Sequence, residues 1–303
     1  MIPKRIVVIG SDWPENEQWC PHWQGIKAGL RRLGVPSLFV SCRPTLNIDS
    51  VVAFDPDLVI YGLMDIVKNA HWRAEIRQRL PSATIVMWYG DFRDDRMNQP
   101  DADCSELDAM FVSNDAQEKR YSRKWKMKKV NFLPLGCEPI DKPQVDSRYA
   151  FDFVFIGGQI QEGAFHDRAS FVETMKIKSD LVLVNSYDPA VRSRIYRAMP
   201  KIYSSSKMAL DVSHFTNIKK YTSIRYWEIP AFFGFALTKR WPGCEEFYPE
   251  NSRIYFDTME EAIEKKDYYL KHEPQRQAIL KRAHALSYNH SYDHRLNQMF
   301  GML

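Results

Sequence analysis

The sequence predicts an α/β protein built from two tandem, doubly wound Rossmann-like domains. The chain has 303 residues, about twice the length of a typical domain. Short apolar runs alternate with helical patterns in both halves, and a segment without periodicity separates the halves. Strict alternation of strand and helix favours right-handed βαβ units and therefore parallel sheets.

The first half contains six apolar runs that we expect to be strands. Most are short and bounded by polar residues, glycine or proline, as is typical of buried parallel strands. These runs are 6–9, 37–40, 58–61, 84–89, 109–112 and 130–134. Helical spacing predicts helices over 23–33, 72–80 and 116–126.

The segment 136–148 holds two prolines and two aspartates and is predicted to be a linker. A second alternating set follows, with strands expected at 153–156, 181–184, 208–212, 235–238 and 253–256. The helices expected in this half are 168–176, 199–206, 224–233, 259–271 and 273–288. We therefore expect domains over 1–140 and 148–288, and residues 289–303 to cross back to the first domain.

Composition excludes several classes of protein. The net charge is only +4, and the five cysteines are scattered without a CxxC pair, so neither a metal knuckle nor a disulfide framework is expected. No window approaches 18 apolar residues, so no membrane span is expected. Reduced thiols favour a cytoplasmic location.

A basic stretch at 119–129 has two interpretations. It carries seven lysines and arginines interleaved with two aromatic residues. It is either a solvated helix face or a patch for an anionic acceptor, nucleic acid included. In the second case Lys119, Arg123 and Lys126 are the candidate acceptor-binding residues.

Three glycines follow predicted strands, namely Gly10, Gly157 and Gly158. Glycine there lets the backbone approach a ligand, although each can equally be a simple turn residue. Neither a GxGxxG nor a GxxxxGK[ST] pattern accompanies them, so a dinucleotide oxidoreductase or a P-loop NTPase is disfavoured.

The segment 221–234 carries the strongest functional pattern. Thr222 and Ser223 are good helix N-caps, and Arg225 and Glu228 lie three residues apart on one helix face. A helix start with an arginine suits a diphosphate, and a carboxylate one turn later suits a ribose diol. The alternative is an ion pair on a capped helix.

This segment belongs to a longer resemblance. Residues 199–213, the pattern Ser223-x-Arg225-x-x-Glu228, and residues 231–238, 245–247, 254–256 and 290–295 resemble the C-terminal domain of CgeB-like glycosyltransferases. These are relatives of the retaining GT-B glycosyltransferases, the glycosyl transferases group 1. The resemblance covers about 148–300, and the first half matches more loosely through 109–113 and 133–139.

The resemblance implies a GT-B fold, in which two Rossmann-like domains face a central cleft and the C-terminal domain binds the sugar donor. Glu228 would hold the ribose, and the diphosphate would lie at Ser223, Ile224 and Arg225. The other donor-binding residues that it implies are Gly157, Gly158, Arg168 and His214. A UDP-sugar is the expected co-substrate, without a cofactor or metal.

Two aspartates are candidates for catalysis on the acceptor side. Asp91 follows the strand 84–89 and can deprotonate or orient a hydroxyl, and Asp12, after the first strand, is its rival. Each is otherwise a charged loop residue. Asp101-x-Asp103 has the letters of a metal motif but lies in a polar loop, so no metal ligation is expected there.

The predicted function is therefore metal-independent, retaining transfer of a sugar from a nucleoside diphosphate sugar to an unidentified acceptor hydroxyl. A DNA-modifying glycosyltransferase acting on hydroxymethylated bases is one alternative, suggested by the basic stretch. The other is a non-catalytic sugar-nucleotide-binding or structural protein. It is suggested by Tyr221, which stands where related families carry an acidic residue seven positions before the ribose glutamate.

Overall fold

The structure of the protein is a computed structural model, and it divides the chain into two compact units. The first comprises Met1–Leu135 and Tyr292–Leu303, and the second Gly136–Ser291. The structure describes residues 2–10, 21–42, 45–62, 70–90, 104–124, 127, 129–158, 166–186 and 188–303.

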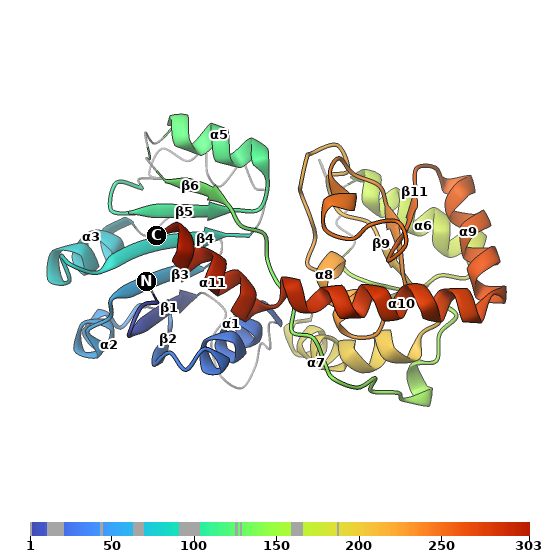
Figure 1. Cartoon of the computed structure of the whole chain (residues 1–303), viewed down its shortest axis with the longest axis horizontal. Helices are drawn as coiled ribbons and strands as arrows, with labels where there is room; N and C mark the ends of the chain where they lie inside the picture. The colour runs from blue at the N-terminus through green and yellow to red at the C-terminus, as the bar shows by residue number, and fades with distance from the viewer. Residues whose placement is uncertain are drawn as a thin grey trace. The chain divides into compact units, whose positions relative to one another are not determined.

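The first unit is built on a six-stranded parallel sheet (Figure 1). The strands are β1 (Ile6–Gly10), β2 (Ser37–Ser41), β3 (Leu58–Gly62), β4 (Thr84–Tyr89), β5 (Ala109–Val112) and β6 (Val130–Phe132), in the order β2-β1-β3-β4-β5-β6. The helices are α1 (Pro21–Arg32), α2 (Ile48–Phe54), α3 (Ala70–Arg79), α5 (Asp115–Lys124) and α11 (Tyr292–Met302).

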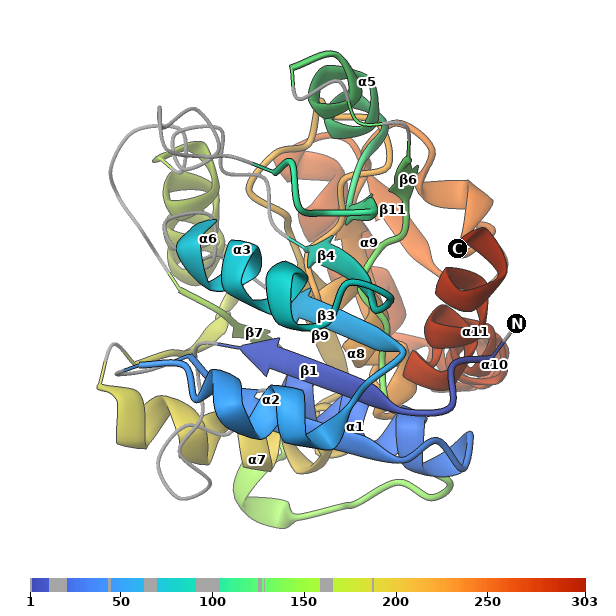
Figure 2. The same cartoon turned by 90° about the vertical axis from the view of Figure 1, so that its left-hand side faces the viewer.

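Both faces of this sheet are covered. Successive side chains of β1 point to opposite faces, so Val7 and Ile9 join one apolar core while Ile6 and Val8 join another. The first core includes residues of α2, α3 and α5, and α2 and α3 pack side by side (Figure 2). The second core includes residues of α1 and α11.

Helices α1 and α11 approach each other closely because α1 carries glycine at the contact. A Cβ added at Gly25 would lie 2.0 Å from the ring of Tyr292, and one at Gly29 would lie 2.8 Å from the backbone nitrogen of Asp293. The last helix of the chain is thereby part of the first unit's core.

The second unit has a five-stranded parallel sheet in the order β11-β10-β9-β7-β8. Its strands are β7 (Phe153–Ile156), β8 (Val182–Val184), β9 (Met208–Asp211), β10 (Ala236–Lys239) and β11 (Ile254–Phe256). Its helices are α6 (His166–Ser179), α7 (Pro189–Ser205), α8 (Arg225–Ala231), α9 (Met259–Lys271) and α10 (Glu273–Ser287). Helices α6, α9 and α10 contribute to an apolar core with the central strands, and α8 packs against β9, β10 and α10.

The prediction of two parallel-sheet units is confirmed, whereas three helices differ from the sequence pattern. Helix α2 is not predicted, although Asn47 caps it by accepting from the backbone nitrogen of Ser50 at 3.1 Å. Helix α7 begins ten residues before the predicted start at 199. Asp188 caps it, and Pro200 lies inside it instead of opening it.

Helix α8 begins at Arg225, and the predicted capping by Thr222 and Ser223 is wrong. Ile224 occupies the cap position without a side-chain hydrogen bond. The Thr222 hydroxyl instead accepts from the Trp227 indole nitrogen at 3.0 Å, and the Ser223 hydroxyl donates to Asp211 at 3.4 Å. Among the described helices, none has the length and apolar character that crossing a membrane requires.

Candidate functional site

The second sheet has a topological switch point beside β7. The chain runs from β7 to β8 on one side and then returns to β9 on the other. In open α/β sheets, ligands bind outside the carboxyl ends of the strands at such a point. Gly157 follows β7, and Val212 follows β9, so these residues mark the expected binding edge.

A pocket of about 250 Å³ opens at this edge. Segments after β7, β8 and β9 contribute to it, together with α6, α7 and α8. Seven of the predicted donor-binding residues line it: Gly157, Gly158, Arg168, His214, Ile224, Arg225 and Glu228. Ser223 is not among the lining residues, and its backbone nitrogen donates to the Ser213 hydroxyl at 3.1 Å.

Glu228 is the most unusual group in this pocket. It is 2% exposed, and among the described residues neither carboxylate oxygen has a hydrogen-bond partner. Burial raises the pKa of Glu228 to about 8, and nearby Arg225 opposes that rise. Because an unpaired buried carboxylate is costly, its position on a cavity wall indicates a group that binds a ligand donor.

Arg225 holds the two strand ends together. Its guanidinium donates to the carbonyl oxygens of Val212 at 2.9 Å and Ile156 at 3.3 Å, and it lies 4.8 Å from the ring centroid of Phe155. A Cβ added at Gly157 would lie 2.7 Å from its Nη1 atom. Arg225 therefore shapes the pocket wall at the switch point, with its two terminal nitrogens directed at main-chain carbonyls.

Asp211, at the end of β9, lies between Arg225 and Arg253. It is 1% exposed and accepts from Arg253 Nη1 at 3.0 Å, and its other oxygen lies 4.0 Å from Arg225 Nε. The Thr238 hydroxyl donates to it at 3.4 Å. Because a buried carboxylate between two arginines is compensated, this network fixes the geometry around α8.

Sequence reasoning missed the contribution of α7. Five of its residues line the pocket at helical spacing, and these are Arg192, Ile195, Tyr196, Met199 and Tyr203. Arg192 is half-buried and has no ion-pair partner among the described residues. The sequence does contain a pattern that predicts the full length of α7, namely the capping pair Asp188-Pro189 followed by this helical spacing. Pro200 argued against a helix that continues through it.

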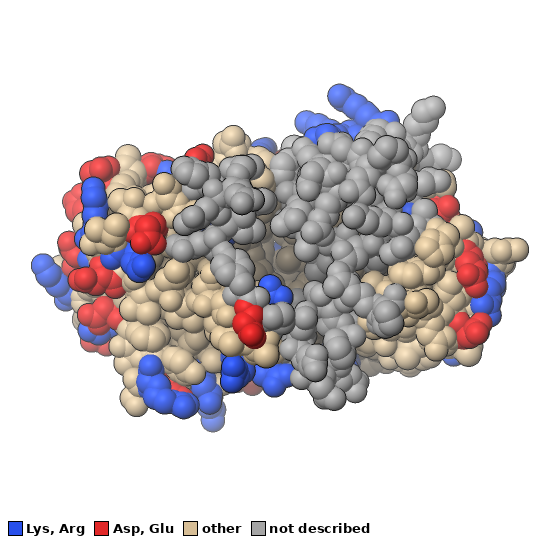
Figure 3. All heavy atoms as spheres, turned by 180° about the vertical axis from the view of Figure 1, so that it is seen from behind, with Lys and Arg blue, Asp and Glu red and all other residues tan. Residues whose placement is uncertain are grey.

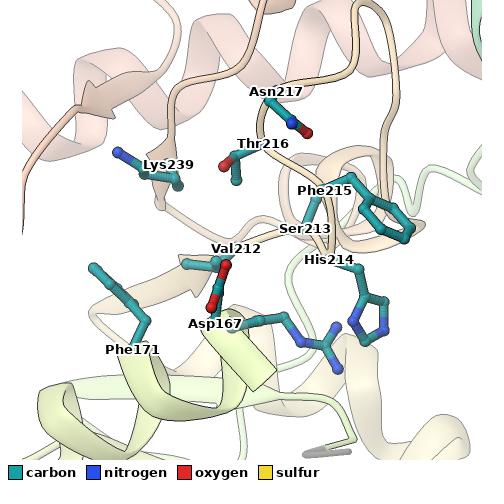
Figure 4. Close-up of a pocket in the computed structure, with 10 residues that line it drawn as sticks. Asp167, Phe171, Val212, Ser213, His214, Phe215, Thr216, Asn217 and Lys239 are labelled. Carbon is teal, nitrogen blue, oxygen red and sulfur yellow. The ribbon is translucent and has the colours of Figure 1, made fainter. Parts of the chain in front are cut away.

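Arg168 and His214 also border a second pocket, of about 470 Å³. Figure 4 shows Asp167 and Phe171 of α6 on one side of it, the segment 212–217 on another, and Lys239 at the end of β10. The Arg168 guanidinium donates to the carbonyl oxygen of Gly158. The two pockets are therefore neighbours that share a cation.

The predicted acceptor-side residues are described only in part. Asp12, Asp91 and Lys126 lie outside the described residues. Lys119 and Arg123 are exposed on α5, and basic side chains project from the edge of the first unit where α5 lies (Figure 3). Within the described part of the chain, no group of three or more histidine, cysteine, aspartate or glutamate residues is arranged to hold a metal ion.

Two Rossmann-like units, each built on a parallel sheet, form the GT-B class of folds, and comparison with known proteins agrees with this architecture. Residues 168–301 match the family described as "Glycosyl transferase-like". The match therefore begins in α6 and covers most of the second unit together with α11. A search of curated proteins gave no match.

Several solved structures share the fold over 98% or more of this chain. HepE of Anabaena, in complex with UDP and glucose, is 9% identical with a TM-score of 0.64, and the match covers 99% of this chain and 100% of HepE. An alpha-glucosyltransferase in complex with UDP is 14% identical with a TM-score of 0.67, covering 98% and 99%. The same kind of enzyme, with UDP and a 13-mer DNA containing an HMU base, is 14% identical with a TM-score of 0.66, covering 100% and 99%.

Proposed function

We propose that this protein transfers a sugar from a nucleoside diphosphate sugar to an acceptor hydroxyl, and that the donor nucleotide binds in the pocket beside β7. The observation that carries the proposal is the buried, unpaired carboxylate of Glu228 on the wall of that pocket. The two hydroxyls of a ribose are the donors that such a carboxylate lacks.

The cations around the pocket support a diphosphate leaving group. Arg168 and Arg192 both line it, on α6 and α7 respectively. Departure of a nucleoside diphosphate leaves negative charge on the phosphates, and fixed positive groups stabilise that charge in the transition state. We therefore propose metal-independent transfer, with Gly157 and Gly158 allowing the backbone to approach the phosphates. Ser223, which is not among the lining residues, is not needed for this arrangement.

The finer assignment follows the sequence resemblance. Residues 199–213 and the Ser223-x-Arg225-x-x-Glu228 pattern support a CgeB-like subtype and, with it, retention of the anomeric configuration. The stereochemistry is read directly from the anomeric proton coupling of the first product in an NMR time course. Inversion would contradict the subtype without affecting donor binding.

On the acceptor side, we propose that Asp91 or Asp12 receives the proton of the attacking hydroxyl. Both follow strands of the first sheet in sequence, after β4 and β1 respectively. Replacing the responsible aspartate by asparagine should lower kcat about 100-fold or more, with the donor Kd unchanged. If both asparagine variants keep the kcat of the wild type, neither aspartate receives the proton and this assignment fails.

A thermal-shift panel tests the donor assignment, because a ligand that binds only the folded state raises the melting temperature. UDP is tested first, since the similar structures contain it, followed by GDP, ADP, CMP and dTDP. We expect one nucleotide to stabilise the protein and Glu228→Ala to abolish the effect. Arg194→Ala, an exposed change on α7, is the matched control.

If no nucleotide shifts the transition, the donor assignment fails. If a nucleotide binds but its UDP-glucose or other sugar conjugate is neither hydrolysed nor transferred to any acceptor offered, the non-catalytic alternative replaces the proposal. Turnover that disappears in Glu228→Ala excludes that alternative.

A nucleic-acid acceptor is a second candidate, favoured by the exposed Lys119 and Arg123 on α5 and by the similar enzyme described with DNA. Fluorescence anisotropy measures the binding of a duplex that carries 5-hydroxymethylpyrimidines. Binding should weaken steeply with salt, and a double Lys119→Ala, Arg123→Ala variant should have a shallower salt slope. Binding that does not change with salt, or that is unaffected by the double variant, would remove this candidate.

A further inference from the structure

The hydroxyl of Tyr203 is a second buried group without a partner in the donor pocket. Tyr203 lies on α7, is 1% exposed and lines the same cavity as Glu228. Among the described residues, its hydroxyl has no hydrogen-bond partner. Buried hydroxyls in proteins are almost always paired, so an unpaired one on a cavity wall indicates a place for a ligand atom.

The ring of Tyr203 is held firmly, so the position of its hydroxyl is fixed. The ring stacks on Phe232, with centroids 6.4 Å apart and an interplanar angle of 20°. A Cβ added at Gly234 would lie 3.2 Å from the Tyr203 Cβ, so the base of the side chain is closely packed as well. The ring is therefore packed on the protein, while the hydroxyl has no hydrogen-bond partner among the described residues.

Tyr203 and Glu228 are close enough to influence each other electrostatically. Burial raises the pKa of Tyr203 well above its usual value, and the Glu228 carboxylate raises it further. Yet the phenol, a donor, and the carboxylate, an acceptor, are not bonded to each other. Both residues line the same pocket, so a third group bound there can contact both.

The chemistry of that third group follows from its two neighbours. It must accept a hydrogen bond from the phenol and donate one to the carboxylate, and an alcohol hydroxyl does both at once. The second carboxylate oxygen of Glu228 is also unpaired and needs another donor. Two adjacent hydroxyls, as in the vicinal diol of ribose, satisfy all three protein atoms.

We propose that Tyr203 is a specificity-determining residue which, together with Glu228, selects ribonucleoside diphosphates over their deoxy analogues. The inference rests on the proposed donor site. One ribose hydroxyl bridges Tyr203 and Glu228, and the other donates to the remaining carboxylate oxygen. Removing either hydroxyl leaves a buried polar group unpaired, so a deoxynucleotide should bind about tenfold or more weakly.

Calorimetric titration of the full chain with UDP, 2′-deoxy-UDP and 3′-deoxy-UDP tests this selectivity. Wild type should bind UDP at least about tenfold more tightly than either analogue. Tyr203→Phe should weaken UDP binding by roughly 3- to 30-fold. For the analogue that lacks the bridging hydroxyl, wild type and Tyr203→Phe should bind equally, because the partner of the phenol is already gone.

The stability of the free protein separates this role from a structural one. Phenylalanine fills the same space and removes only an unpaired hydroxyl, so the melting temperature of free Tyr203→Phe should equal or exceed that of wild type. Tyr268→Phe, a change at an exposed tyrosine on α9, is the control and should alter no affinity.

The outcomes distinguish the two levels of the argument. If wild type binds no UDP, GDP, ADP, CMP or dTDP, the donor site itself fails. If UDP binds but both deoxy analogues bind as tightly, or if dTDP, itself a 2′-deoxynucleotide, binds best, ribose selection is overturned while the donor site stands. If Tyr203→Phe weakens all three uridine nucleotides by the same factor, or lowers the melting temperature of the free protein, Tyr203 supports the fold and does not read the diol.

Discussion

Replacing Glu228 by glutamine should change how the stability of the protein depends on pH. The folded-state pKa of Glu228 is about 8, against 4.5 for an ordinary glutamate. Between these two values the folded chain keeps a proton that the unfolded chain has lost. Unfolding therefore releases a proton, and the stability of the wild type falls as pH rises through this window.

The size of the effect follows from the separation of the two pKa values. Well inside this window, a rise of one pH unit lowers the free energy of unfolding by about 1.4 kcal/mol. The step from pH 5 to pH 7 therefore lowers it by roughly 3 kcal/mol. For a unit of this size, that corresponds to a drop of about 6–12 °C in melting temperature. Glutamine does not titrate, so Glu228→Gln should lack this contribution.

Differential scanning calorimetry of both proteins from pH 5 to pH 8 measures the difference directly. Other titrating groups, such as the buried His22, contribute equally to both curves and cancel. Saturating the wild type with the donor nucleotide should reduce the slope, because ribose hydroxyls stabilise the carboxylate. Parallel curves for wild type and Glu228→Gln would refute the reasoning, since Glu228 would then be ionised or solvated in the folded protein.

Three further substitutions test the pocket. Gly157→Ala should lower the melting temperature of the free protein in the thermal-shift assay because its Cβ would lie 2.7 Å from a guanidinium nitrogen, whereas Gly158→Ala, with nothing within 4 Å, should leave that temperature unchanged. Asp211→Asn should lower the free energy of unfolding by about 3–5 kcal/mol in calorimetry, as it leaves two buried arginines undercompensated; an unchanged transition would contradict the network. Arg192→Ala should weaken UDP binding about tenfold, measured by titration, while exposed Arg194→Ala should not; equal losses would remove the role of the first.

The strands could be predicted from sequence more reliably than the helices. Buried parallel strands are continuous apolar runs, and nearly every one ended where the run ended. Helix α7 was shortened because Pro200 is an expected helix breaker, yet here the helix continues through it. Helix α2 has only seven residues, too few for periodicity to indicate it.

The candidate site was predictable only as a set of residues along the chain. The sequence predicted that Arg225 and Glu228 share one helix. It did not predict that Arg225 donates to the carbonyls of Ile156 and Val212, because these lie at the ends of strands that are distant in sequence. Nor does sequence reveal which buried polar atoms stay unpaired, so Tyr203 gave no signal. Both facts depend on how the strand ends meet in space.

The close packing of α11 on α1 has a consequence for the order of folding during synthesis. The core that covers one face of the first sheet is incomplete until Tyr292, Leu296, Met299 and Phe300 have left the ribosome. By then the whole of Gly136–Ser291 has been made, so the later-made unit can fold while the earlier one still exposes apolar surface. A nascent chain arrested before residue 292 should therefore be captured by holdase chaperones through its first 135 residues.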